Sequence, residues 1–269
     1  MPTSRSPRPR IEPPPAPRAR RWPLILLAVV LLALACIFVL PASLLGRFLP
    51  AGVHAEDFSG SLLHGAAGKL RVGERDAGAL EWRLHPAALL RLTLLVDIHW
   101  VKIGFVIDGT AEISRAHFAA HAIQGGGPIE SLSDLGVAPG WRGIATVSFD
   151  EIAGDFSRLD HAVGKIDVSN LSSTGIAAGS DLGGYELQLP GGAVAADGTV
   201  SASLTDTGGP VELRAQLHLS PATRTGMLSG TLKEGPDASA DLRNQLGSLA
   251  QMHARDASGR FPVDLEFTF

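Results

Sequence analysis

The 269-residue sequence contains a single cysteine, Cys36, and only 6% of its residues are aromatic. With one cysteine, the chain can form neither an intramolecular disulfide nor a cluster of cysteine metal ligands. A fold built by the residues after Cys36 must therefore be held by its own hydrophobic core.

Basic charge is scarce outside the first 21 residues. Those residues carry six arginines and one acid, Glu12, so subtracting them from the totals of 23 basic and 27 acidic residues leaves 17 and 26. The rest of the chain thus has a net charge of −9. We expect no nucleic-acid partner, because nucleic-acid binding depends on basic patches that neutralise phosphates.

Long hydrophobic runs are missing after residue 40, but one precedes it. Trp22–Leu40 contains no charged residue, and at 1.5 Å per residue it nearly spans a hydrocarbon core of roughly 30 Å. A signal cleavage site at Ala33-Leu34-Ala35 and a lipidated Cys36 are the alternatives, but the run continues through Leu40 beyond both, which favours an uncleaved anchor. The preceding arginines predict a cytoplasmic N-terminus and an exported C-terminal part.

The first 21 residues include seven prolines, and this composition is typical of an extended, disordered segment. We therefore divide the chain into a disordered tail rich in Pro and Arg (1–21), a transmembrane anchor (22–45) and an exported β-rich domain (46–269).

The exported part has the pattern of a mainly β protein. In "VELRAQLHL", Val211 to Leu219, apolar and polar residues alternate without exception, which is the period of a half-buried strand. Glycine-rich turn signals separate similar runs, so we expect a curved, mostly antiparallel sheet. The other runs are Gly68–Val72, Ala79–Leu84, Leu92–Asp108, Gly143–Phe149, Lys165–Val168, Tyr185–Leu189, Thr199–Leu204, Gly226–Leu232 and Pro262–Phe269, and the turn signals are Asp108-Gly109, Gly125-Gly126-Gly127-Pro128, Gly191-Gly192, Asp197-Gly198 and Gly208-Gly209-Pro210.

Two segments depart from the strand pattern. "HPAALLRL" predicts a short helix that begins at Pro86 and directs Leu89 and Leu90 inward. "ADLRNQLGSLAQM" predicts a helix over Ala240–Met252, whose stripe of Leu242, Leu246 and Leu249 packs on the sheet.

The sequence also contains a weak internal repeat. "GKLRVG" (68–73) with "GALEWRLHP" (78–86) resembles "GKIDVS" (164–169) with "GGYELQLP" (183–190), which suggests two related halves of one continuous sheet joined near Gly136–Gly143.

No motif of known chemistry is present, and we predict no catalytic, cofactor-binding or metal-binding residue. The nearest candidate is the pair His117 and His121, but this i, i+4 spacing binds a metal only on a helix, and no third ligand flanks it. We interpret the two histidines as half-exposed residues at the end of a strand. The acidic pair Asp150-Glu151 is typical of a turn. Asn170, in the sequence "NLS", would be a glycosylation site only in a eukaryotic secretory route.

The order of segments resembles the type II secretion system protein N family over nearly the whole exported region. The resemblance rests on a basic N-terminus, one membrane helix, and the stretches "FSGSLLHGAAGKLRV", "GALEWRLHPAALLRLTL", "GWRGIATVSFDEI", "LGGYELQLP" and "GGPVELRAQLHLSPATRTGMLSGTLKEG". The element from Gly60 to Gly65 matches the family's glycine-bounded element before the first strand pair, with Leu63 where Trp is usual, and Val168 replaces a second Trp.

This resemblance implies a single-pass protein of the bacterial inner membrane, with a periplasmic C-terminal domain. Its expected role is that of a non-enzymatic accessory or scaffold that supports export of folded proteins across the outer membrane. Other secretion components of the inner-membrane platform or the secretin are then its partners. The alternative is an AsmA-like protein for lipid transport or envelope maintenance, which would need an open apolar trough where a scaffold closes its apolar face with its own helix. An outer-membrane barrel, suggested by the apolar stripe that ends at Phe269, is disfavoured by the retained anchor, and we interpret the stripe as the last core strand.

Overall fold

The computed structural model describes residues 40–47, 49, 52–176, 179–192, 194–249 and 255–268. The chain divides into Met1–Val39 and a compact unit, Leu40–Phe269, to which all of these residues belong. The expected tail and most of the expected anchor lie outside the described residues. Within the described part, no helix has the length and apolar character needed to cross a membrane.

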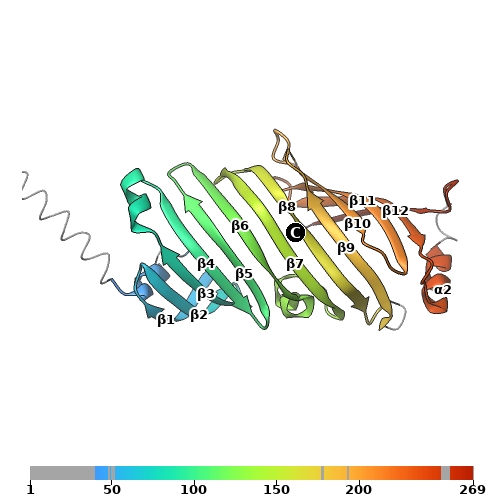
Figure 1. Ribbon diagram of the computed structural model, residues 1–269, viewed down its shortest axis with the longest axis horizontal. Coiled ribbons are helices and arrows are strands. Elements are labelled where there is room, and N and C mark those ends of the chain that lie inside the picture. The colour runs from blue at the N-terminus through green and yellow to red at the C-terminus, as the bar shows by residue number, and fades with distance from the viewer. Residues whose placement is uncertain are drawn as a thin grey trace, which may run out of the picture. The chain divides into compact units, whose positions relative to one another are not determined.

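The compact unit is built on one antiparallel sheet of 13 strands, in which each strand pairs with the strand before and after it in the chain. Figure 1 shows β1 to β12 side by side in this order, with β11 and β12 turned relative to β7, as the natural twist of a sheet produces. The strands are β1 (Val53–Gly60), β2 (His64–Val72), β3 (Arg75–Leu84), β4 (Leu94–Lys102), β5 (Phe105–Ile113), β6 (His117–Pro128), β7 (Trp141–Asp155), β8 (Leu159–Ser173), β9 (Asp181–Leu189), β10 (Val200–Asp206), β11 (Val211–Ser220), β12 (Thr225–Glu234) and β13 (Phe261–Thr268).

Helices are few and short. Among the described residues, three are 3-10 helices, namely η1 (Ala42–Arg47), η2 (Pro86–Arg91) and η3 (Ile129–Leu135), and one is the α-helix α2 (Ala240–Leu249). The predicted C-terminal helix is therefore confirmed from Ala240 to Leu249, while residues 250–254 lie outside the described part. The short helix predicted at Pro86 is also present, because proline fits the first turn of a helix.

The register divides the sheet into one apolar and one polar face. Residues opposite each other in an antiparallel ladder share a face, and one such row crosses the sheet from β1 to β13 without a polar side chain. Its members are Phe58, Ala67, Leu80, Trp100, Ile107, Gly125, Val147, Ile166, Leu187, Leu204, Ala215, Gly230 and Val263. We call the face that carries this row the apolar face.

The neighbouring row, from β3 to β13, is polar throughout: Glu81, His99, Asp108, Gln124, Ser148, Lys165, Gln188, Ser203, Gln216, Ser229 and Asp264. The period-2 pattern read in the sequence therefore produces a two-sided sheet, and Leu217 and Gln216 lie on opposite faces as predicted.

Several boundaries differ from the prediction. Leu92–Asp108 is not one strand, because the chain reverses at Ile103 and Gly104, whose φ angles of 43° and 83° are left-handed. Asp108-Gly109 lies inside β5 and not in a turn, and β1 was not predicted at all.

The glycines at 125–127 are likewise in β6, where turn chemistry was expected. A side chain at Gly125 would collide with the backbone carbonyl oxygen of Val106 on the adjacent strand, so this glycine permits close strand approach. Asp150-Glu151 is also within a strand, at a register shift of β7 between Phe149 and Glu151.

Two further predictions about apolar side chains are wrong. Leu89 and Leu90 do not point inward, since they are 36% and 88% exposed. The terminal stripe is not fully in the core either, because Leu265 and Phe267 on the edge strand β13 are 56% and 42% exposed.

The two predicted related segments do form the hairpins β2–β3 and β8–β9 of one continuous sheet, but their registers differ. Leu80 lies opposite Ala67, whereas its sequence counterpart Tyr185 lies opposite Val168. The cause is the connection, because β2 and β3 are joined by a tight turn and β8 and β9 by residues 174–180. The two hairpins are therefore not equivalent in detail.

Candidate functional site: the apolar face of the sheet

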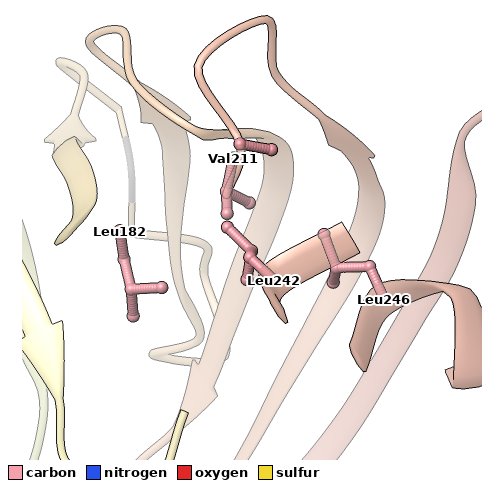
Figure 2. Close-up of a cluster of buried hydrophobic side chains, with 5 residues drawn as sticks. Leu182, Val211, Leu242 and Leu246 are labelled. Carbon is pink, nitrogen blue, oxygen red and sulfur yellow. The ribbon is translucent and has the colours of Figure 1, made fainter. Parts of the chain in front are cut away.

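The apolar face is covered at both ends and in the middle by short segments. At the C-terminal end, Leu242 and Leu246 of α2, which are 2% and 7% exposed, form a cluster with Leu182 of β9 and Val211 of β11. Figure 2 shows both leucines on the side of α2 that is directed toward Val211 and Leu182. The predicted packing of this helix on the sheet is therefore confirmed for these two leucines.

In the middle of the sheet, η3 covers a second cluster of Phe105, Ile129 and Ala145. Lys102 holds this region together, because its side chain is 1% exposed and its ammonium donates to the backbone carbonyl of Asp76 and to Asp134 Oδ2 at 3.3 Å. A buried ammonium requires such partners, since an unpaired buried charge is strongly destabilising.

At the N-terminal end, between η1 and strands β1 to β4, the apolar face forms a groove of about 220 Å³. Every residue that lines it is apolar: Leu45, Leu49, Ala55, Phe58, Ala67, Leu70, Leu80, Trp82, Leu84, Leu94, Val96 and Ile98. We call this the N-terminal groove. Its walls contain no charged or hydrogen-bonding side chain other than the indole of Trp82.

That indole is fixed by two contacts. Trp82 Nε1 donates to the carbonyl oxygen of Leu62 at 3.0 Å, and the ring packs edge-on against Phe58 with ring centroids 6.4 Å apart. The polar atom of Trp82 is thus already satisfied, and the groove offers an apolar ligand only hydrophobic burial, worth roughly 25 cal/mol per Å².

Sequence analysis did not predict the N-terminal groove. The alternation of Leu80, Trp82 and Leu84 indicated one wall, but Leu45 was assigned to the anchor, Leu49 to no element of the exported domain, and β1 was missed. The groove depends on contacts between η1 and β1, which no local pattern reveals.

The polar face carries close contacts between histidine and aspartate side chains. His85 Nε2 lies 2.7 Å from Asp97 Oδ2, and His99 Nδ1 lies 2.6 Å from Asp108 Oδ1. The hydrogen bond from His85 lowers the pKa of the Asp97 carboxyl below its usual value. These pairs are exposed to water and are not arranged around a buried nucleophile.

The two histidines singled out in the sequence lie on β6, a strand. His117 is opposite Asp155 and His121 is opposite Glu151, and the i, i+4 spacing therefore places them well apart instead of on one helical face. Among the described residues, no group of three or more His, Cys, Asp or Glu side chains could hold a metal ion. Asn170 is an exposed residue with a φ of 52°, at a register shift of β8.

The fold and site define a class of protein: an antiparallel sheet with one apolar and one polar face, whose apolar face is partly covered by its own helices. A family model of the type II secretion system (T2SS), protein N, matches residues 51–264, which is most of the chain and nearly all of the sheet. The chain belongs to this family. No curated protein and no solved structure matched the chain.

Proposed function

We propose that this protein is a non-enzymatic accessory of the type II secretion apparatus, anchored in the bacterial inner membrane, whose periplasmic sheet serves as a scaffold. The family match over residues 51–264 carries the proposal. Family membership implies interaction with other type II secretion components, and an open sheet can offer strand edges and loops to them.

The chemistry of the described residues supports a role without turnover. The row of polar residues spreads across the sheet from Glu81 to Asp264 instead of converging on one point. Catalysis requires an acid, base or nucleophile placed together around a reacting atom.

The proposed location rests on the apolar run Trp22–Leu40 and on the six arginines before it. A reporter enzyme that is active only after export, fused after Phe269, should be active in cells. Its inactivity, or a mature chain beginning at Cys36, would contradict the proposed topology.

The role itself is tested by deleting the gene in its native host and measuring secretion. We expect folded secreted proteins to accumulate in the periplasm while envelope lipid composition stays normal. A chain lacking residues 240–252 should fail to restore secretion, because α2 buries the end of the apolar face. Normal secretion in the deletion strain would refute the proposal.

One observation favours a second candidate, an apolar-ligand or lipid-binding role. The C-terminal helix covers only one end of the apolar face, and the N-terminal groove has walls typical of a site for an alkyl chain. Replacing Ala55, which lines the groove, with Phe should fill it. If the second candidate holds, this variant releases less co-purified lipid than wild type and the deletion strain has an outer-membrane lipid defect with unimpaired secretion.

A further inference from the structure

The segment between β3 and β4 exposes large apolar side chains on a hydrogen-bonded backbone. Leu90 at the end of η2 is 88% exposed and Leu92, which follows η2, is 72% exposed. The Leu92 backbone N–H donates to the carbonyl oxygen of Leu89 at 3.0 Å, and the Thr93 N–H donates to that of Ala88 at 3.3 Å. These hydrogen bonds therefore hold both leucines at the surface, where a partner that covered them would remove apolar area from water.

The backbone conformation at Leu92 is also unusual. Its φ of 59° is left-handed, a conformation that few residues other than glycine adopt. Local strain of this kind is retained where the surrounding structure or a function requires it. Here it ends η2 and turns the chain so that Leu90, Arg91 and Leu92 are all exposed.

This segment lies close to the residue where the apolar run ends. The backbone N–H of Leu62 donates to the carbonyl oxygen of Leu40 at 2.9 Å, and the N–H of Leu84 donates to that of Leu63 at 2.7 Å. Leu84 directly precedes His85 and Pro86, the start of η2. Two backbone hydrogen bonds and adjacent residues thus connect Leu40 to η2, a path on the order of 20 Å.

A basic residue accompanies the two exposed leucines. Exposed Arg91 stands between the two leucines, and a basic residue beside apolar side chains suits the boundary between anionic headgroups and acyl chains. The turn at the opposite ends of β2 and β3, Glu74-Arg75-Asp76, has mixed charge and lines a pocket with Asp134 of η3.

We propose that η2 is a membrane-contacting element, with Leu90 and Leu92 inserted at the headgroup boundary of the bilayer that the run 22–40 enters. The proposal rests on the proposed membrane anchorage and deepens it: the sheet is not merely tethered but is held with the β3–β4 connection against the membrane. The partner is a lipid surface with anionic headgroups.

The test uses the full-length chain reconstituted in vesicles of phosphatidylethanolamine and phosphatidylglycerol. Cys36 is the only cysteine, so a Cys36→Ser background allows one environment-sensitive fluorophore to be attached at a chosen site. Leu90→Cys is the probe, and Ile103→Cys is the matched control, because Ile103 is 75% exposed in the turn at the other end of β4. The two sites are separated by the length of that strand, about 30 Å.

We expect lipids carrying a quencher to reduce fluorescence at residue 90 severalfold more than at residue 103. The double change Leu90→Glu and Leu92→Glu, with the label placed at Thr93→Cys, should abolish that quenching. Circular dichroism should remain unchanged, because both leucines are already exposed. Equal quenching at residues 90 and 103 would overturn the proposal, as would strong quenching that survives the double change.

Resistance of the protein to alkaline extraction from the vesicles distinguishes this inference from the anchorage on which it rests. A chain that resists extraction but shows no quenching at residue 90 is anchored without contact by η2, and a protein partner would then be the cover for Leu90. A chain that is extracted refutes the anchorage itself.

Discussion

The packing of α2 on the sheet leads to a quantitative prediction for Leu242→Ala. Leu242 is 2% exposed and contacts the cluster formed by Leu182, Val211, Ala238 and Leu246. The matched control is Arg243→Ala, one residue further on the same helix and exposed to solvent. Alanine has the highest helix propensity, so neither change weakens the helix intrinsically.

The expected cost comes from the cavity and the lost burial. Replacing a fully buried leucine with alanine costs about 2–5 kcal/mol, depending on how far the site collapses. The cluster lies at one end of the sheet and can relax, so we expect the lower part of this range, about 2–3 kcal/mol, or roughly a 30- to 150-fold change in the opening equilibrium. Arg243→Ala should cost less than about 0.5 kcal/mol.

Amide hydrogen exchange followed residue by residue is the suitable assay, because α2 can detach from the sheet without global unfolding. Leu242→Ala should accelerate exchange in α2 and at Val211 by the stated factor, and Arg243→Ala should leave both unchanged. Equal exchange rates in the two variants would show that α2 is not held by this cluster and would refute the assignment of its buried side.

Three further predictions concern single residues or pairs. Burial raises the pKa of Tyr185, the chain's only tyrosine, to about 12, so tyrosinate absorbance should rise near pH 12 in the folded protein and near pH 10 in urea. The stability that the neutral phenol contributes is complete below pH 10 and declines as the pH rises from 10 toward 12. A folded-state midpoint at pH 10 would contradict the burial. Leu217→Asp puts a charge on the apolar face and should destabilise the sheet by several kcal/mol, measured as protease susceptibility, whereas Gln216→Asp on the polar face should be nearly silent; equal resistance of both variants would show that the faces are wrongly assigned. In the deletion strain, the double variant His117→Ala and His121→Ala should restore secretion as well as wild type does. Failure of this variant with an intact fold would indicate that the two histidines have a functional role, such as metal binding.

The sequence determined the two-sidedness of the sheet. Strict alternation along Val211–Leu219 is a local property, since successive side chains of a strand point to opposite faces. The period of Leu242 and Leu246 likewise identified the buried side of α2, because residues four apart share one side of a helix.

Tertiary structure decided what local patterns leave open. The glycines at 125–127 predicted a turn but lie within β6. The reason is a tertiary contact, because the adjacent strand approaches too closely for a side chain at Gly125. The sequence showed that Leu90 is apolar, but only the structure shows that it lies exposed on η2. The N-terminal groove joins Leu45 to Leu94 across four strands. Such contacts between distant residues depend on strand order and register, and no single segment of the chain encodes these.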